Sequence, residues 1–482
     1  MKLDELLKNV NAKEIHGKTD LDIKSVENYH KNVKNGSLYI AIIGENVDGH
    51  SYITQAVRQG AIVIVCEKFI ADLGVCCVVV ENARKAMTEI LSNFYGNPER
   101  RLKIVGVTGT NGKTTVTYML KHIIESYGIK TGVIGTLGCK FGDKCIDTGL
   151  TTPDPLVLFK ILKEMEDDGV KVVLMEVSAH AIELNKIDCI EFYAGIFTNL
   201  TQDHLDFFKN MDNYKNAKLK FLNKSRCKYL VVNSDDDVGV ELLTKCDEVL
   251  SYGIDNPADV FAVNIKQHNN GERFVINIFD DVFDVNLKLY GKHNVYNAMA
   301  SLLTATLLGV PAFFAINALE SFIGVSGRLE KVYDGDFKVF IDYAHTPDGL
   351  KKTLTTLKEL SENRLVCLFG CGGNRDSDKR SKMGEISTNI ADFTIITSDN
   401  PRFEEPMSII HEIEKGAKKG KNNYALIESR LSAIEYALRN VNCGDILLLA
   451  GKGSEKYQEI LGIKQPFDDK EYTLELLANN NL

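Results

Sequence analysis

The sequence lacks the features of a membrane protein, a disulfide-rich secreted protein and a nucleic-acid-binding protein. No apolar run approaches the roughly 18 residues that span a bilayer, and residues 1–20 contain no apolar signal core. The eleven cysteines form no CxxC pair, so we interpret them as small core residues in a reducing compartment. A net charge of −9 does not favour a nucleic-acid partner. We therefore expect a cytoplasmic protein that acts on small molecules without membrane insertion. We also expect it to be a monomer.

What the sequence does contain is an alternation of apolar strands and amphipathic helices. Strand-like runs at 103–109, 130–136 and 171–178 are separated by helical segments such as 157–169. This order predicts an α/β protein with parallel, doubly wound sheets. A length of 482 residues is too great for one core. We expect three α/β domains in series, the last of them Rossmann-like, at residues 1–98, 99–326 and 327–482.

A glycine-rich loop follows the first strand of the expected central domain. The stretch "VGVTGTNGKTTVTYML" (105–120) passes from an apolar strand through this loop into a helix. Glycines let backbone N–H groups converge on phosphate oxygens, and the helix N-terminus adds positive potential. Lys113 would reach the β- and γ-phosphates and Thr114 a bound Mg²⁺. Because Val107 departs from the strict P-loop pattern, the alternative is a turn that only caps the helix. We predict a P-loop NTPase-like sheet that binds ATP through Gly109, Thr110, Asn111, Gly112, Lys113, Thr114 and Thr115.

Acidic and imidazole side chains follow two further strands of this domain. Glu176 and Ser178 come at the end of one apolar run, and Asp203 and His204 follow another. Each group alone could be a helix cap or a surface residue. Since the carboxyl ends of parallel strands form the edge where ligands bind, Glu and His together predict a shared divalent cation.

The loop T-G-T-N-G-K-T-T resembles that of the Mur ligase family, ATP-dependent amide-forming enzymes of cell-wall precursor synthesis. Further matches are "YKNAK" (214–218), "YGKHNVYN" (290–297), "GRLE" (327–330) and "IDYAHTPDGL" (341–350). The resemblance implies four Mg²⁺ ligands: Thr114, Glu176, His204 and Lys218, the last as a CO₂-derived carbamate. It also implies four catalytic residues, Lys113, Glu176, His204 and Lys218, and further ATP contacts by Asn294, Asn297, Arg328 and Asp342.

Two of these assignments depend on the resemblance alone. Without it, Lys218 would be a solvated lysine on an amphipathic helix, and Arg328 a surface residue. A carbamate is chemically sensible, because capture of CO₂ converts a group that repels Mg²⁺ into a carboxylate-like ligand. In the family the third domain completes the ATP site, so we expect catalysis to require domain closure.

The first domain carries the expected donor site. The segment 36–61 resembles the uridine-binding domain of the UDP-N-acetylmuramoyl-tripeptide synthetases, and "LTTPDPL" (150–156) resembles their T-T-P motif. The implied donor is UDP-N-acetylmuramoyl-L-alanyl-D-glutamate. The match is incomplete, since His30 and Lys31 replace a serine and an arginine of the family. The implied donor contacts are Thr151, Thr152, Ser178 and Lys186.

The third domain carries three stretches that resemble the amino-acid site of the ligases adding meso-diaminopimelate. They are "FGCGGNRDSDKRSKMGEI" (369–386), "SDNPRFEEP" (398–406) and "LAGKGSEKYQE" (449–459). Arg402 offers the two-pronged donor that a second substrate carboxylate needs. Lysine lacks that carboxylate, so it would leave Arg402 buried and unpaired and be rejected. The implied amino-acid contacts are Arg375, Asp399, Asn400, Pro401, Arg402, Gly451 and Glu455, with Asp399 and Glu455 meeting ammonium groups.

The resemblance therefore implies an ATP-dependent ligase that forms an acyl phosphate and then an amide. Several alternatives stay open. The same ligase could add lanthionine or L-lysine, or the chain could be a divergent paralogue with a modified donor. A folylpolyglutamate-synthetase-like ligase would lack the uridine domain, and a nucleotide-binding regulatory protein would have no need of Lys113, Glu176, His204 and Lys218.

Overall fold

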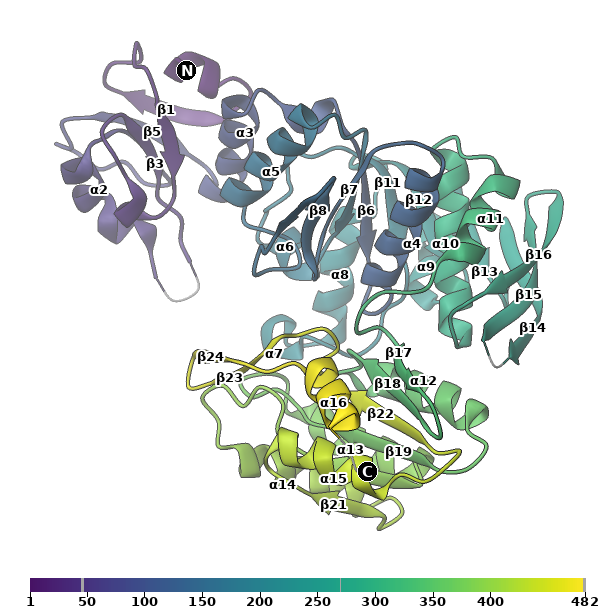
Figure 1. Ribbon diagram of the computed structural model, residues 1–482. Helices are drawn as coiled ribbons and strands as arrows, with labels where there is room; N and C mark the ends of the chain where they lie inside the picture. The colour runs from purple at the N-terminus through teal and green to yellow at the C-terminus, as the bar shows by residue number, and fades with distance from the viewer. Residues whose placement is uncertain (45–46, 269, 480–482) are drawn as a thin grey trace. The chain divides into compact units, whose positions relative to one another are not determined.

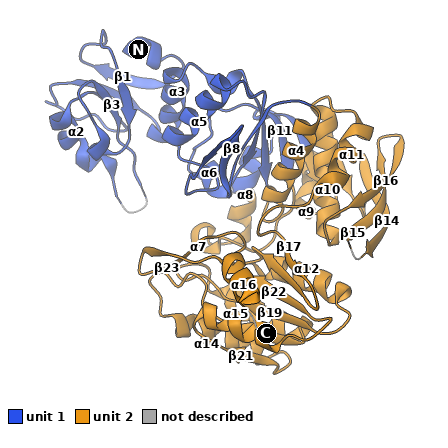
Figure 2. Cartoon of the chain, viewed as in Figure 1, with its two compact units in different colours: residues 1–108, 128–196, 217–230 blue, residues 109–127, 197–216, 231–482 orange. Residues whose placement is uncertain are grey.

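The computed structural model describes residues 1–44, 47–268 and 270–479, with elements labelled as in Figure 1. The chain divides into two compact units (Figure 2). Unit 1 contains residues 1–108, 128–196 and 217–230, and unit 2 contains residues 109–127, 197–216 and 231–482. Glu45 and Asn46 of the first-domain motif lie outside the described residues.

The N-terminal part of unit 1 is a small sheet with the strand order β1-β5-β4-β3-β2. Strands β2 to β5 pair in parallel and β1 pairs antiparallel to β5. The central strands are almost entirely buried, as expected for parallel strands covered on both faces. The elements are α1 (Leu3–Leu6), β1 (Ala12–His16), β2 (Ser25–Glu27), β3 (Ser37–Ile40), α2 (Ile53–Gln59), β4 (Ala61–Cys66), β5 (Cys76–Val80) and α3 (Ala83–Phe94).

The rest of unit 1 contains strands in the order β11-β6-β10-β7-β8-β9. Strands β6, β10 and β7 are parallel, and Val107 pairs with Glu176 at their carboxyl ends. Gly106 in β6 is required by packing, because a Cβ there would lie 2.6 Å from the Phe221 ring. The elements are β6 (Lys103–Thr108), β7 (Thr131–Gly135), β8 (Gly138–Phe141), β9 (Lys144–Ile146), α5 (Pro155–Asp167), β10 (Val172–Glu176), α6 (Ala179–Glu183) and β11 (Phe192–Phe197).

Three described elements carry the chain between the units: β11, by its last residue Phe197, α8 (Met211–Phe221) and β12 (Cys227–Asn233). In unit 2, β14, β15 and β16 form an antiparallel meander, and β13 pairs in parallel with β14. The elements of this part are α4 (Lys113–Ser126), α7 (Leu205–Phe208), α9 (Asp237–Lys245), β13 (Val249–Gly253), β14 (Val260–His268), β15 (Gly271–Ile278), β16 (Asp281–Leu287), α10 (Lys292–Leu307) and α11 (Ala312–Ser321).

The C-terminal part of unit 2 is a doubly wound sheet with the order β17-β18-β22-β19-β20-β21, parallel except for β17. Successive side chains point to opposite faces. Phe340 and Leu448 therefore pack with α12, α13 and α14, whereas Val339 and Leu447 pack with α15. The elements are β17 (Glu330–Asp334), β18 (Lys338–Asp342), α12 (Pro347–Leu360), β19 (Leu365–Phe369), α13 (Asp378–Ile390), β20 (Phe393–Ile396), α14 (Pro406–Ala417), β21 (Tyr424–Leu426), α15 (Arg430–Asn440), β22 (Ile446–Ala450), β23 (Tyr457–Ile460), β24 (Ile463–Pro466) and α16 (Asp469–Ala478).

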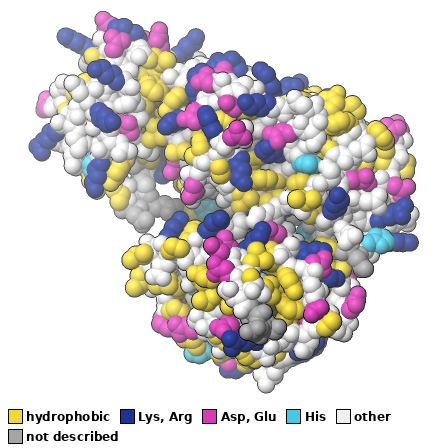
Figure 3. All heavy atoms as spheres, in the orientation of Figure 1, with side chains coloured by type: hydrophobic (Ala, Val, Ile, Leu, Met, Phe, Trp, Pro, Cys, Tyr) yellow, Lys and Arg dark blue, Asp and Glu magenta, His cyan; other side chains and the backbone are white. Residues whose placement is uncertain are grey.

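The predicted α/β class with parallel sheets is confirmed, and the boundaries 98/99 and 326/327 stay predictions. All eleven cysteines are free thiols, but Cys145 and Cys443 are exposed, so the core interpretation is wrong for these two. Across the part of the chain that the structure describes, no helix is long and apolar enough to cross a membrane. On the face shown in Figure 3, acidic and basic side chains are intermixed rather than segregated.

Candidate active site

The P-loop connects β6 to α4, which begins at Lys113. Gly109 is required here, because a Cβ would lie 1.9 Å from Oγ1 of Thr198. The Lys113 ammonium donates to the carbonyls of Gly109 and Thr110 at 2.9 and 2.8 Å. The cation is therefore already held over the loop in which phosphate oxygens are expected to sit.

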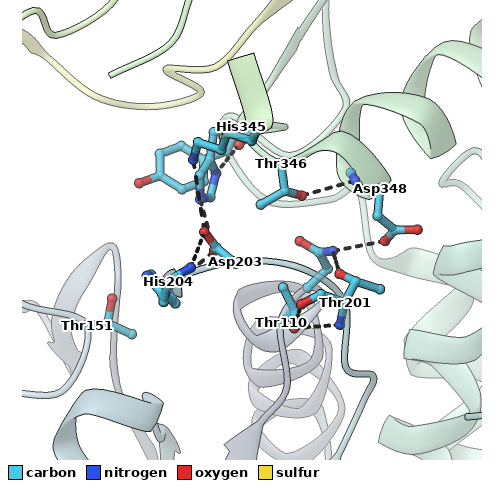
Figure 4. Close-up of polar contacts among 12 residues, drawn as sticks. Thr110, Thr151, Thr201, Asp203, His204, His345, Thr346 and Asp348 are labelled. Carbon is cyan, nitrogen blue, oxygen red and sulfur yellow. Dashed lines mark hydrogen bonds and ion pairs between the residues drawn. The ribbon is translucent and has the colours of Figure 1, made fainter. Parts of the chain in front are cut away.

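The segment after β11 holds this loop in shape. Asn199 accepts the Asn111 N–H through its side chain at 3.0 Å, and its carbonyl accepts the Thr110 N–H at 2.8 Å. The Thr201 N–H donates to Oγ1 of Thr110 at 3.0 Å (Figure 4). These bonds join the segment after β11 to the loop at Thr110 and Asn111 and hold its conformation.

Helix α10 brings its two asparagines to the same loop. Nδ2 of Asn297 donates to Oδ1 of Asn294 at 3.0 Å, so the two share one helix face as the sequence predicts. A Cβ on Gly112 would lie 2.6 Å from Oδ1 of Asn297. Asn297 therefore lies against the P-loop, and Asn294 supports it.

Arg328 and Asp342 play different parts. Nη2 of Arg328 donates to Oγ1 of Thr114 at 3.2 Å, and its guanidinium stacks 4.2 Å from the Tyr343 ring centroid. The Asp342 carboxylate is buried and accepts the Leu329 N–H at 2.6 Å and the Ala344 N–H at 2.9 Å. Burial raises the pKa of Asp342, although Arg328 and these N–H donors oppose the rise. Asp342 thus holds the Arg328 loop, an arrangement that the sequence did not predict.

Asp348 is a residue that sequence reasoning missed. Its carboxylate accepts a 3.1 Å hydrogen bond from Nδ2 of Asn111 in the P-loop (Figure 4). It lies in the first turn of α12, where Oγ1 of Thr346 caps the helix by accepting the Gly349 N–H at 3.1 Å. An acidic residue in a first turn is ordinary helix chemistry, so nothing in the local sequence marks Asp348 as part of this site.

A buried carboxylate lies beside His204. Oδ2 of Asp203 lies 3.3 Å from Nε2 of His204 and 3.7 Å from Nε2 of His345 (Figure 4). Its Oδ1 lies 4.0 Å from Nζ of Lys379. Burial opposes ionisation, but the His345 contact and the charges of His204 and Lys379 hold the pKa of Asp203 well below its usual range. Asp203 therefore orients His204. His345 and Lys379 lie in two of the matched motifs, but nothing in those motifs indicates that either residue approaches Asp203.

In unit 1, Glu176 lies at the carboxyl end of β10 and is fully buried. Its two oxygens accept from the Thr136 N–H and hydroxyl, both at 3.0 Å. The Thr136 hydroxyl also lies 3.1 Å from that of Thr151. Gly135 is required beside them, because a Cβ would lie 2.2 Å from Oε1 of Glu176. The carboxylate is thus held in one orientation.

The expected donor-binding residues gather at the same strand end. The Thr152 hydroxyl donates to the Glu176 carbonyl at 2.8 Å and accepts the Ser178 N–H at 3.0 Å. Nζ of Lys186 forms a 2.7 Å ion pair with Asp154. In the N-terminal part of unit 1, the buried His30 ring stacks on the Tyr52 ring with centroids 4.2 Å apart.

Lys218 differs from the expectation for a solvated helix lysine. It is only 1% exposed, near the end of α8 in unit 1. Glu176 lies in the same unit, whereas Thr114 and His204 belong to unit 2. Among the described residues, no group of three or more histidine, cysteine, aspartate or glutamate side chains is arranged to hold a metal ion. A lysine carbamate and a threonine hydroxyl are outside those residue types.

The expected amino-acid site is a connected network in unit 2. Nδ2 of Asn400 donates to Oε2 of Glu455 at 2.8 Å. Nζ of the buried Lys452 donates to the same Glu455 oxygen at 3.2 Å and to Oδ1 of Asn400 at 3.3 Å. Gly451 has a φ of +104°, and a Cβ there would lie 2.7 Å from Oδ2 of Asp399. The structure thus brings together Asp399, Asn400, Gly451 and Glu455.

Arg402 corrects the sequence interpretation. We expected it to be buried and unpaired when no second carboxylate is bound. Its side chain is 21% exposed, Nε lies 3.3 Å from Oε2 of Glu459, and Nη1 donates to the Gly373 carbonyl at 2.8 Å. The expectation is wrong because a distant strand, β23, supplies a carboxylate. Pro401 packs its carbonyl against Gly373, and Arg375 is exposed.

His293, at the start of α10, gives the fold a pH dependence. Burial lowers its pKa from 6.5 to about 4, and Lys352 lowers it further, while Asp348 opposes the shift. Between these pKa values the unfolded chain binds more protons, so stability falls as the pH drops from about 7 toward 4. We expect the free energy of unfolding to lose about 1–2 kcal/mol from this group between pH 7 and pH 5. Urea unfolding of His293→Gln and the parent at both pH values tests this, and equal losses would contradict it.

Comparisons with known proteins show which family this chain resembles along its length. Family models described as "Mur ligase family, catalytic domain", "Mur ligase middle domain" and "Mur ligase, glutamate ligase domain" match residues 31–95, 107–305 and 327–453. The UDP-N-acetylmuramoyl-L-alanyl-D-glutamate–2,6-diaminopimelate ligase of Caldanaerobacter subterraneus subsp. tengcongensis is 44% identical, with 100% of both chains covered.

A ligase of the same name from Alkaliphilus oremlandii is 43% identical, also with 100% of both chains covered. A solved structure of a ligase with that name is 27% identical, covers 99% of each chain and gives a TM-score of 0.71. From these matches, the chain belongs to the Mur ligase family.

Proposed function

We propose that this protein is the ATP-dependent ligase that joins meso-diaminopimelate to the D-glutamate of UDP-N-acetylmuramoyl-L-alanyl-D-glutamate, in peptidoglycan precursor synthesis. The observation that carries the proposal is 44% identity along the whole chain to a relative named for that reaction. The polar network around Asn400, Glu455 and Arg402 supports it. We propose that it acts in the cytoplasm, where ATP and nucleotide-linked substrates are available.

The reaction proceeds in two displacements. The donor carboxylate attacks the γ-phosphorus of ATP, the bond to the bridging oxygen breaks, and an acyl phosphate and ADP form. The amine of the amino acid then attacks the acyl carbon, phosphate leaves, and the nitrogen loses a proton. Lys113 and Arg328 offset charge on the transferring phosphoryl group. Asn294 and Asn297 contact the nucleotide, and Asp342 acts through Arg328.

The residues assigned to Mg²⁺ suit that ion chemically. The Thr114 hydroxyl, the Glu176 carboxylate and a Lys218 carbamate are oxygen donors, and His204 adds a nitrogen. Lys218 is only 1% exposed, and a carbamate there would supply a carboxylate-like oxygen ligand from a position shielded from water. When bound, Mg²⁺ would stabilise the charge that develops on the transferring phosphoryl group.

Phosphate release by the purified protein tests the function. The assay contains ATP, Mg²⁺ and UDP-N-acetylmuramoyl-L-alanyl-D-glutamate, with meso-diaminopimelate, lanthionine, L-lysine or no amine. We expect release with meso-diaminopimelate and none without an amine. Release with lanthionine as well would show that the second carboxylate matters more than the linking atoms. Release with lysine alone would refute the assignment of meso-diaminopimelate as the substrate. No phosphate release in any reaction would favour a paralogue that uses another donor.

Arg402→Ala should change the choice of amino acid. Loss of the guanidinium removes a charged hydrogen-bond partner of the far carboxylate, so KM for meso-diaminopimelate should rise about tenfold or more. Turnover with saturating substrate should change less. Arg439→Ala is the matched control, since Arg439 is exposed on α15 and pairs with Glu435. Equal KM values for Arg402→Ala and the control would remove Arg402 from recognition.

A further inference from the structure

Strand β23 runs beside the loop that carries Arg402. The Arg402 N–H donates to the Glu459 carbonyl at 3.0 Å, and the Leu461 N–H donates to the Arg402 carbonyl at 2.7 Å. The Glu459 N–H donates to Oδ1 of Asn400 at 2.9 Å. These bonds join the strand to the predicted amino-acid site. Glu459 takes part in them through its backbone N–H and carbonyl, and not through its side chain. Its side chain is therefore not needed to hold the strand in place.

The Glu459 side chain lies on the Arg402 guanidinium. Its Oε2 is 3.3 Å from Nε, and the two side chains are 23% and 21% exposed. Nη1 is turned to the Gly373 carbonyl at 2.8 Å. A carboxylate binds arginine best through two parallel N–H donors. An incoming carboxylate thus meets a guanidinium whose Nε already faces an anion.

We infer that Glu459 is a specificity-determining residue that competes with the far carboxylate of the amino-acid substrate for Arg402. This inference rests on the proposed function. Two consequences follow from the competition. Binding a diamino-diacid requires the Glu459 contact to be broken or shared, which weakens binding. Binding lysine leaves Arg402 still paired with Glu459, so the penalty against lysine is smaller than for an unpaired arginine.

A different role for Glu459 would have the opposite sign. The far end of a diamino-diacid also carries an ammonium, and a carboxylate beside Arg402 could accept from it. Removal of the Glu459 charge would then weaken binding of the diacid instead of strengthening it. A purely structural role would alter all amino acids alike.

Glu459→Gln separates these roles, because it keeps the size of the side chain and the backbone bonds of β23. We would measure KM for meso-diaminopimelate by phosphate release, and the inhibition constant or KM of L-lysine in the same assay. The control is Glu475→Gln, which makes the same charge change at an exposed position of α16. We expect KM for meso-diaminopimelate to fall about two- to fivefold, the range for a partly exposed ion pair. Binding of lysine should weaken or stay unchanged.

The outcomes distinguish this inference from the function on which it rests. A parent enzyme that releases no phosphate with meso-diaminopimelate would refute the proposed function and the inference together. Normal parent turnover, with a raised KM for the diacid in Glu459→Gln, would refute competition alone and favour contact with the far ammonium. Equal changes for the diacid and lysine, or none beyond those of Glu475→Gln, would also overturn the inference.

Discussion

Replacing Lys113 with alanine should reduce the rate of amide formation at least about a thousandfold, as for loss of a strong electrostatic stabiliser of a transition state. The Lys113 ammonium lies over the P-loop, bonded to the carbonyls of Gly109 and Thr110. On the proposed mechanism these bonds give way to contacts with phosphate oxygens, whose charge rises as the γ-phosphoryl group is transferred. Alanine offers no replacement for that charge. The initial rate of phosphate release with all substrates measures the effect.

The matched control for this substitution is Lys121→Ala. Lys121 lies two turns along the same helix and pairs with Glu125, so the change removes one cation from α4 without touching the loop. Calorimetric titration with ADP shows whether the Lys113 variant still binds nucleotide. A Lys113→Ala protein that turned over like Lys121→Ala would exclude Lys113 from the chemistry.

The parts of the site that sequence reasoning located are those whose chemistry is local. The P-loop needs a glycine at position 109, where a Cβ would lie 1.9 Å from Oγ1 of Thr198. It also needs an amine at Lys113, directly after Gly112. The pairing of Asn294 with Asn297 follows from helical spacing. The buried strands were recognisable for a similar reason, because their apolar runs need no knowledge of a partner.

The parts that were missed depend on contacts between segments distant in sequence. Asp348 meets Asn111 across 237 positions of the chain, and its own neighbourhood indicates only a helix start. Strands β14 to β16 carry exposed polar residues at many positions, so no continuous apolar run marks them. Burial of Lys218 is set by what packs around α8, which the amphipathic pattern of one helix cannot specify.

Arg402 shows how such a contact changes a functional argument. The sequence suggested discrimination against lysine through an arginine left without an anion. Glu459 is 57 positions away and belongs to a short strand with no apolar pattern. Nothing in the sequence therefore indicates that its carboxylate lies beside Nε of Arg402. Recognition of the far carboxylate by Arg402 stays a proposal, and on that proposal the free-energy penalty for binding lysine is smaller, because Glu459 still faces the guanidinium.

Replacing Lys218 with alanine should also reduce turnover by at least about a hundredfold, because the proposed carbamate would be lost from the metal's ligands. Lys218 is only 1% exposed, so the substitution also leaves a space in unit 1 that lowers stability. The melting temperature therefore has to be recorded beside the rate. Lys220→Ala is the control, since Lys220 lies on the same helix, is exposed and pairs with Glu183.

If Lys218 acts as a carbamate, two further results are expected that a packing role does not predict. Acetate or formate added to Lys218→Ala should restore part of the activity in a saturable way, because a small carboxylate can occupy the space and replace the missing oxygen donor. Turnover of the parent protein should fall in CO₂-free buffer and return when bicarbonate is added, since a carbamate exchanges with dissolved CO₂. A stable Lys218→Ala protein with parent-like turnover would remove Lys218 from the mechanism. Loss of activity without rescue by carboxylates, in a parent insensitive to CO₂, would leave Lys218 as a packing residue and Mg²⁺ without its fourth proposed ligand.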